Sequence, residues 1–444
     1  MRRLLPRHPA QLVVWGFAIA VLLGTAALLL PFARAGPGGA PFFVALFTST
    51  SAVCVTGLIT VDTATYWSPF GQATIMVLCQ IGGFGIMTLT SILALLVARR
   101  LGLRTRVIAQ LETGALELGD VRQVVKGVAI LSFLFEAVTA AILTVRFLVS
   151  YDYGLGQALW HAAFHSVTAF NNAGFALYSD NLVGFVTDPW VSLAIAFAII
   201  AGGLGFPVWI ELWRLRLSPR RWSLHTKLTL SMTGLLIVGG TAAILGFEWS
   251  HDETLGSLGL GGKLVAGFFQ GVTPRTAGFN TLDYAQMEPE SLLVTDMLMF
   301  VGTGSAATGG GIKVTTFALL ALMVLAEVRG DPNVNAFGRR VPPVAQRQAL
   351  TVAFLGINAV VIGALALMAF SHFPLGQALF EAISAFGTVG LSTGITGDLT
   401  PAGEGILIAL MFIGRTGPHV LAAALVLRER ERLYRLPEDR PIIG

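Results

Sequence analysis

FEAISAFGTVGL, residues 380–391, decides the fold of this chain, because three further stretches repeat its layout. The other copies are FTSTSAVCVTGL (47–58), FHSVTAFNNAGF (164–175) and FFQGVTPRTAGF (268–279). Each copy begins with Phe and has, ten residues later, a Gly that is followed by Leu or Phe. A polar, glycine-ended segment that recurs four times in an apolar chain predicts four pieces closing around one axis.

The composition of the chain is that of a polytopic membrane protein. Of its 444 residues 54% are hydrophobic and 12% are charged, and the mean hydropathy is +0.74. A soluble domain carries about 25% charged residues. The net charge of +4 is no sign of nucleic-acid binding, because the basic residues sort into short loops between apolar runs. Cys54 and Cys79 form no metal-binding pattern, and we expect two isolated small side chains rather than a disulfide.

The apolar runs predict an all-α protein with eight full spans, since about 20 apolar residues cross a hydrocarbon core of about 30 Å. The spans are expected at 11–34, 70–98, 123–149, 190–214, 225–248, 291–327, 348–371 and 402–428. The first run is too long for the apolar part of a signal peptide, and we interpret it as a retained span.

Between the two spans of each pair lies a shorter amphiphilic stretch that suits a re-entrant half-helix. These stretches are 40–51, 157–169, 262–273 and 376–386. The repeat unit is therefore span, half-helix, polar loop, span, with boundaries at 1–107, 108–222, 223–340 and 341–444. Irregular backbone at membrane depth is tolerated only where it is buried in protein or lines water, and four such loops meet that condition by facing one central pore.

The distribution of Lys and Arg predicts the topology. Most of the 29 basic residues fall in the two termini and in the loops around 99–126, 214–227 and 329–347. By the positive-inside rule this side is cytoplasmic, so both termini lie inside and all four half-helices enter from outside. Carboxylates on the outer side, such as Asp62, Asp188 and Glu248, either form a vestibule that concentrates cations or are ordinary solvated loop charges.

The glycine-ended segments are candidates for an ion-selectivity filter. Glycine has easy access to positive φ, which lets carbonyls point at a common line, and rings of carbonyls replace the hydration shell of potassium in its channels. The expected filter residues are Val55, Thr56, Gly57, Asn172, Ala173, Gly174, Thr276, Ala277, Gly278, Thr388, Val389 and Gly390. The alternative is that these glycines serve helix packing or helix caps.

Three of these segments, Phe164–Phe175, Gln270–Asn280 and Ile383–Leu391, resemble the filter segments of the Trk/Ktr/HKT superfamily of potassium-uptake proteins. Eight spans resemble the Ktr membrane subunit more than the longer Trk subunit. The resemblance implies a pseudo-fourfold pore, a homodimer, and a cytosolic ring of regulatory subunits that bind nucleotides and dinucleotides. Some plant relatives carry Ser at the first filter position and favour sodium, so Gly57 argues for potassium.

The stretch GTGSAATGGGIK (302–313) interrupts the sixth span. Glycine costs about 1 kcal/mol relative to Ala in a helix, so this stretch predicts a flexible break at membrane depth. We interpret it as a gate below the filter, and the resemblance implies an intramembrane gating loop here. The expected gate residues are Gly302, Thr303, Gly304, Ser305, Thr308, Gly309, Gly310, Gly311, Lys313 and Arg415. The alternative is a static kink.

Two of these gate residues are basic. Arg415 lies in the last span, where a charge is costly and marks a functional candidate. We expect it to act as an electrostatic barrier or to bind carbonyls of the glycine-rich stretch, and the alternative is a structural Arg without a transport role. Lys313 is nearer the cytoplasmic end and is expected to extend its amine to the interface.

Three other features carry weaker signals. His161 and His165 have a metal-like spacing, but a polar half-helix face is the better interpretation. Arg275, within the third filter segment, is expected to turn away from the pore and bind carbonyls or a carboxylate, with Glu381 as a guessed partner. We find no paired catalytic carboxylates and no catalytic triad, so an enzyme is not expected.

The sequence therefore predicts the potassium-translocating subunit of an uptake system in the bacterial plasma membrane. No cofactor is expected in the chain: potassium is the transported ion, and sodium is an open possibility as coupling ion. The nucleotide-binding partner would dock on loops such as 214–227 and 327–347. The alternatives are a cation-coupled secondary transporter with alternating access, since broken helices also fit that class, and, less well, a membrane enzyme or receptor.

Overall fold

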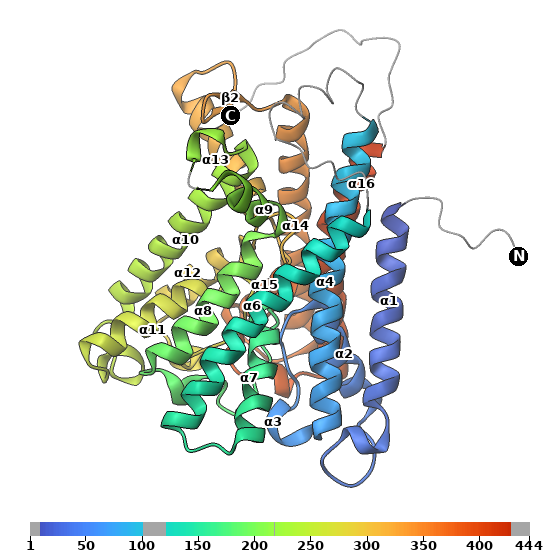
Figure 1. The fold of residues 1–444 in the computed structure, drawn as a ribbon, viewed down its shortest axis with the longest axis vertical. Helices are drawn as coiled ribbons and strands as arrows, with labels where there is room; N and C mark the ends of the chain where they lie inside the picture. The colour runs from blue at the N-terminus through green and yellow to red at the C-terminus, as the bar shows by residue number, and fades with distance from the viewer. Residues whose placement is uncertain (1–8, 101–120, 217, 428–444) are drawn as a thin grey trace, which may run out of the picture.

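The computed structural model describes residues 9–100, 121–216 and 218–427. Its regular structure in these ranges is helical, apart from a short hairpin of β1 (Asn335–Ala336) and β2 (Arg339–Arg340). Long helices run side by side, and shorter helices fill the space between them (Figure 1). The basic residues predicted at the two termini and at 101–120, and the repeat boundary at 107, lie outside the described residues.

Four of the described helices are each long and apolar enough to cross a membrane. They are α4 (Pro69–Arg100), α6 (Val121–Ser150), α10 (Leu224–Glu248) and α14 (Pro343–Phe370). Large apolar side chains on their outer faces are exposed, such as Phe133, Leu235 and Phe354, which is what lipid contact requires. These helices make the chain a membrane protein.

The remaining predicted spans correspond to helices that are shorter or interrupted. They are α1 (Pro9–Leu28), α8 (Pro189–Leu204) with α9 (Phe206–Leu215), α12 (Pro289–Phe300) with α13 (Val314–Arg329), and α16 (Pro401–Leu427). The pair of α8 and α9 counts as a fifth candidate span if the two helices are taken together. The number of eight spans therefore stays a prediction.

The continuous span predicted over 190–214 is wrong. The chain turns by 94° between α8 and α9. Gly205 stands at the turn with φ of 87°, a conformation that glycine adopts easily, and Pro207 is tolerated in the first turn of α9, where no amide donor is needed. The sixth predicted span is therefore not the only one that is broken within the described residues.

Four short helices precede the glycine-ended segments. They are α2 (Phe42–Cys54), α7 (Leu155–Phe170), α11 (Leu260–Val272) and α15 (Leu375–Gly387). Each packs on the long helix before it: α2 on α1, α7 on α6, α11 on α10 and α15 on α14. Each also packs on another long element: α7 on α4, α11 on α8, α15 on α12 and α2 on α16. The last of these contacts joins the two ends of the described chain and closes the bundle.

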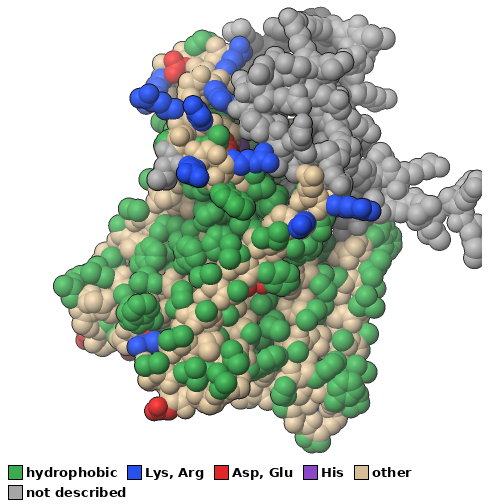
Figure 2. Space-filling model, in the orientation of Figure 1, with side chains coloured by type: hydrophobic (Ala, Val, Ile, Leu, Met, Phe, Trp, Pro, Cys, Tyr) green, Lys and Arg blue, Asp and Glu red, His purple; other side chains and the backbone are tan. Residues whose placement is uncertain are grey.

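Within the described ranges, the connections between the long helices contain short elements. They are η1 (Pro31–Ala33), α3 (Thr63–Tyr66), η2 (Val183–Phe185), η3 (Pro219–Arg221), η4 (Asp252–Gly256), η5 (Tyr284–Gln286) and η6 (Ile395–Asp398). Apolar side chains cover the broad middle of the molecular surface, whereas Lys and Arg side chains gather at the end that holds α13 and the β1–β2 hairpin (Figure 2). This division is typical of a protein with a lipid-facing belt and one basic end.

Candidate functional site: the glycine ring and the broken helix

The four glycine-ended segments share one backbone conformation. The residue two before each glycine has positive φ: 58° at Val55, 59° at Asn172, 67° at Thr276 and 50° at Thr388. The glycine itself is also positive: 91° at Gly57, 67° at Gly174, 74° at Gly278 and 94° at Gly390. Non-glycine residues rarely adopt this region. The repetition of so uncommon a pattern means that the four loops have the same shape although their sequences differ.

Hydrogen bonds fix these loops to the ends of their helices. In the first segment the Thr56 amide donates to the Ser51 carbonyl at 2.8 Å, and the Gly57 amide donates to Ser51 Oγ at 3.0 Å. In the fourth segment Ser384 accepts from Val389 and Gly390 in the same way, at 2.8 and 3.1 Å. The third segment differs, since Thr273 Oγ1 donates instead to the Phe279 carbonyl.

The four glycines lie next to one another in a closed order, and we call them the glycine ring. A Cβ atom placed on any of them would fall less than 3.0 Å from the carbonyl oxygen of the residue before the next glycine. The pairs are Gly57 with Ala173, Gly174 with Ala277, Gly278 with Val389, and Gly390 with Thr56. The last pair returns to the first segment. Only glycine permits this approach, which gathers four carbonyl oxygens around one small space.

The twelve predicted filter residues are thus brought together. All are buried except Gly390, which is partly exposed. The first and fourth segments meet at Gly390 and Thr56, and their helices meet where α2 packs on α16. The whole bundle, rather than one loop, therefore holds the ring. Main-chain carbonyls in such an arrangement can replace water around a monovalent cation.

The chain between α12 and α13 forms an irregular loop, which we call the 301–313 loop. Its two ends are held together, because the Gly302 amide donates to the Ile312 carbonyl at 2.8 Å and the Val314 amide to the Thr303 carbonyl at 3.1 Å. Nearly every residue in it is buried; Ser305, the partly exposed member, lies 3.2 Å from Thr315 through their hydroxyls. The loop is therefore a packed part of the protein interior.

This loop contacts the filter segments directly. The Gly310 amide donates to Thr388 Oγ1 at 3.0 Å, and Thr308 Oγ1 lies 3.2 Å from the Asn172 side-chain amide. A Cβ atom at Gly309 would collide with Thr276 Oγ1. Three of the four positions that precede the glycine ring are thus in contact with the loop, and the glycines of the loop are what allows it to come so close.

The loop is also bonded to the bend between α8 and α9. The amides of Gly304 and Thr308 donate to the carbonyls of Gly203 and Gly202, at 2.9 and 3.2 Å. The Phe206 amide at the start of α9 donates to the Ala306 carbonyl at 3.3 Å. Our sequence interpretation missed these partners. The sequence signal for this contact was the group of three glycines at 202, 203 and 205, which is equally typical of close helix packing.

Arg415 is fully buried in α16 and binds two main-chain carbonyls. Its Nη1 donates to the Thr308 carbonyl in the loop, and its Nη2 donates to the Gly82 carbonyl in α4 at 2.9 Å. Of the two alternatives posed for its role, the carbonyl contact is present. The side chain thereby connects the 301–313 loop to two helices that are far apart in the sequence.

Lys313 does not reach the interface, so that expectation is wrong. Its side chain is 6% exposed, and Nζ donates to the Gly309 carbonyl at 2.6 Å. The folding of the loop over its own end explains the difference, because it places a carbonyl within reach of the amine four residues later. The loop therefore encloses one cation of its own and receives a second from Arg415.

Arg275 turns to carbonyls, as expected, but Glu381 is not its partner. Its Nη1 donates to the Thr233 carbonyl at 3.2 Å and its Nη2 to the Gly302 carbonyl at 3.5 Å. The Glu381 carboxylate instead accepts from the hydroxyls of Ser392 and Thr396. The pairing failed because Glu381 has hydroxyl partners in the loop that follows its own helix.

The two predicted histidines do not act as a metal-binding pair. His165 is buried, and its Nδ1 lies 2.7 Å from the carbonyl of His161, where it completes a helical turn. Its Nε2 accepts from the amide of Leu177 at 3.2 Å. With both ring nitrogens in use, His165 holds the segment after Gly174 against its half-helix.

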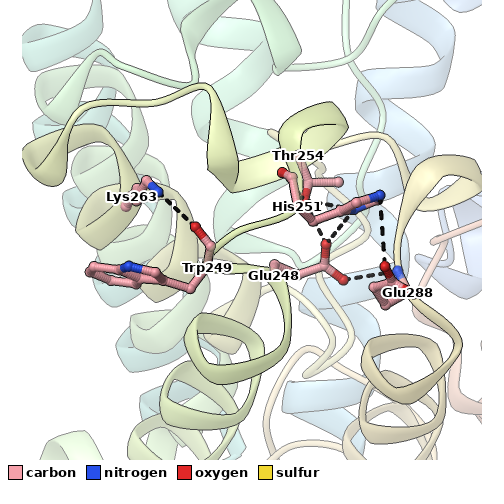
Figure 3. Close-up of polar contacts among 6 residues, drawn as sticks. All are labelled: Glu248, Trp249, His251, Thr254, Lys263 and Glu288. Carbon is pink, nitrogen blue, oxygen red and sulfur yellow. Dashed lines mark hydrogen bonds and ion pairs between the residues drawn. The ribbon is translucent and has the colours of Figure 1, made fainter.

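Two of the carboxylates considered for an outer vestibule are buried and accept hydrogen bonds from the protein. Glu248, at the end of α10, accepts from Thr254 Oγ1 at 2.5 Å and from the Glu288 amide at 3.0 Å, and it lies 3.1 Å from His251 (Figure 3). Asp188 caps α8 and binds Arg146 at 2.7 Å. For these two residues neither sequence interpretation holds: Asp188 is a helix cap, and Glu248 holds the loop after α10 against the start of α12.

Asp62 has a similar role near the first segment. Burial alone would raise the pKa of its carboxyl, but hydrogen bonds from Ser179, Thr65 and the Ala64 amide hold the pKa below its ordinary value. The Ser179 hydroxyl donates at 2.6 Å, so this carboxylate connects the loops that follow Gly57 and Gly174.

Comparison with known proteins places these features in a family. The family model described as a cation transport protein, TrkH, matches residues 34–432. Ktr system potassium uptake protein B of Bacillus subtilis is 40% identical over 98% of this chain and 97% of its own length. Potassium/sodium uptake protein NtpJ of Enterococcus hirae is 36% identical over 98% of this chain and 97% of its own.

A solved structure has the same fold. The crystal structure of the potassium transporter TrkH from Vibrio parahaemolyticus aligns with a TM-score of 0.72, covering 96% of this chain and 86% of that one, at 18% identity. This chain belongs to the TrkH family of cation transport proteins, which are membrane transporters and not enzymes.

Proposed function

We propose that this chain carries potassium into the cell through one pore, with the glycine ring as its selectivity filter. The observation that supports this best is the closed order of four glycines, each against the carbonyl before the next. Relatives at 40% and 36% identity over nearly the whole chain are named for potassium uptake and for potassium/sodium uptake. The ion would exchange its water for carbonyls of residues 55–57, 172–174, 276–278 and 388–390.

The proposed architecture is four repeats around the pore, at 1–107, 108–222, 223–340 and 341–444, with eight spans and both termini in the cytoplasm. The packing of each half-helix between two long helices supports it, as does the recurrence of one backbone pattern in all four loops. A closed ring favours a pore over alternating access, because rocking one pair of repeats against the other would open the contacts between neighbouring glycines.

The proposed gate is the 301–313 loop with Arg415. The loop touches the filter segments from one side, and it encloses Lys313 and receives the Arg415 guanidinium. Two buried cations at this place oppose the passage of a third positive charge. Conduction would require the loop to leave the contacts with Asn172 and Thr388.

Control of this gate would come from a partner. We propose a homodimer that binds a cytosolic ring of nucleotide-binding regulatory subunits, with docking on cytoplasmic loops that include 327–347. Sodium is the proposed coupling ion, with support from the name of the relative NtpJ. We also propose that the chain lies in the plasma membrane, where an uptake subunit would have to act.

Uptake of rubidium into vesicles tests the proposal. Purified chain in liposomes should accumulate labelled rubidium when the interior is made negative, and external potassium should compete more strongly than sodium. Vesicles prepared with heat-denatured protein are the control. Uptake no greater than in the control vesicles, with and without external sodium, would contradict the proposed function.

A further inference from the structure

The short helix α9 runs in a different direction from the helix before it. It follows α8 at 94°, and it lies toward the basic end of the molecule, with α13 and the β1–β2 hairpin (Figure 1). Its inner residues Phe206 and Ile210 pack with Val124 and Val128 of α6. An orientation across the bundle is expected of a helix that lies in the plane of the membrane interface.

The outer end of α9 and the turn after it form an exposed surface of one charge sign. Trp213 is 82% exposed, and Arg216, Arg220 and Arg221 are exposed as well. We call these four residues the α9 basic surface. The one acid between 205 and 223 is Glu211, and its carboxylate is occupied by the start of α10, accepting from the Ser223 amide at 2.5 Å and Ser223 Oγ at 2.6 Å.

The chemistry of this surface selects its partner. Three guanidinium groups in a segment whose one acid, Glu211, is already occupied favour an anionic surface, and an exposed indole beside them is typical of the level of the lipid headgroups. An acidic protein would satisfy the arginines, but it would not account for a Trp that is exposed at the end of an apolar helix. The combination fits the phosphates of anionic phospholipids.

The other end of α9 is bonded to the 301–313 loop. Its first amide, that of Phe206, donates to the Ala306 carbonyl, and Gly205 packs against the carbonyls of Ser305 and Ala306. Two more bonds join the loop to the last residues of α8. A force that fixes α9 therefore also fixes the loop in the position where it contacts the filter.

We propose that the α9 basic surface binds anionic lipid headgroups and that this binding holds the 301–313 loop in its position below the glycine ring. The inference rests on the proposed function only for its flux readout. A ligand that binds one of two states shifts the population toward that state, so anionic lipid should lower the basal flux of the chain alone.

The first test compares vesicles of phosphatidylcholine with vesicles that also contain phosphatidylglycerol. Rubidium uptake should be lower in the anionic vesicles, of the order of fivefold, the effect that one basic side chain near an anionic surface can supply. The R220Q/R221Q double variant should lose this difference and show the higher flux in both vesicles. The R34Q/K263Q variant removes two partly exposed basic side chains elsewhere, after η1 and on α11, and should behave as the parent. Equal uptake by the parent in both vesicles, or loss of the difference in R34Q/K263Q, would overturn the proposal.

The second test does not depend on transport. Cys54 and Cys79 are the two cysteines of the chain and both are buried, so Trp213→Cys can be labelled selectively with a polarity-sensitive dye. Its emission should shift to shorter wavelength when phosphatidylglycerol is added, and R220Q/R221Q should abolish the shift. An unchanged emission overturns lipid binding even if no flux is measured. If R220Q/R221Q leaves the shift intact but abolishes capture of the regulatory subunit, the surface is a protein-docking site and the proposal is wrong.

Discussion

At the scale of the residue, the glycine ring depends on four positions where a side chain has no room. Gly57 combines a φ of 91° with a carbonyl oxygen, that of Ala173, within 3.0 Å of where a Cβ would lie. A substitution there must move the carbonyl of the neighbouring segment. Because selectivity depends on the number and placement of carbonyl dipoles, this is the most sensitive kind of position in the proposed filter.

Gly57→Ser should weaken the preference for potassium over sodium by about tenfold, which corresponds to ~1.4 kcal/mol of discrimination. The physical reason is displacement of the Ala173 carbonyl by the new side chain. Competition of potassium and sodium against rubidium uptake in vesicles measures the ratio. Gly38→Ser is the matched control, because Gly38 has a φ of 82° with no atom within 4 Å of a Cβ. Unchanged selectivity in Gly57→Ser would remove this glycine from the filter.

Some of these residues could be placed from the sequence, and others could not. The positions of the four glycines follow from spacing alone, because the layout of Phe and Gly repeats in register. The sequence did not predict the partners of Arg275 and Lys313, since each binds a carbonyl whose place is set by tertiary folding of the 301–313 loop. Backbone carbonyls carry no sequence signal, so a buried cation that binds them has no recognisable partner in the sequence.

At the scale of the element, the bend between α8 and α9 and the 301–313 loop form one unit. The Phe206 amide donates to the Ala306 carbonyl of the loop, and the loop carbonyls of Ser305 and Ala306 contact Gly205. The glycines of 302–313 indicated a break in their own span, because five glycines in so short a stretch cannot sustain a helix. The bend of the other span could not be predicted in the same way, since it is required by contacts with this loop.

Gly205→Ala should loosen the loop and raise the rubidium flux of the chain alone, by about five- to thirtyfold. Gly205 has a φ of 87° and a ψ of 153°, a region essentially open to glycine alone that costs other residues roughly 1–3 kcal/mol, and the Ala Cβ would also press on the Ser305 carbonyl. Gly330→Ala is the control: φ there is 70°, but no atom lies within 4 Å of a Cβ. Flux in Gly205→Ala that matches Gly330→Ala would separate the bend from the gate.

Deletion of residues 303–310 should raise flux without the partner subunit, because it removes the contacts of the loop with Asn172 and Thr388. Rubidium uptake measures the effect, and thermal unfolding of the purified variant shows whether the bundle is retained. A folded deletion variant with the flux of the parent would rule out the loop as the gate.

At the scale of the whole molecule, the contact of α2 with α16 closes four similar units into one ring. Hydropathy predicted a mostly helical membrane protein with short helices between longer ones, and the family assignment agrees with it. The number of full spans is harder to obtain, because helices that are broken around a pore do not present one continuous apolar run. Among the described spans, the chain bends between α8 and α9 and is interrupted between α12 and α13. Conduction would be controlled on the side of the molecule where these two breaks lie.

The central claim is tested most directly by locating the ion. Crystals of the chain grown with rubidium should show an anomalous scattering peak at the centre of the glycine ring, beside the carbonyls of Thr56, Ala173, Ala277 and Val389. The peak should weaken when potassium is added in excess. A strong rubidium peak elsewhere in the bundle, with none at the ring, would contradict the account.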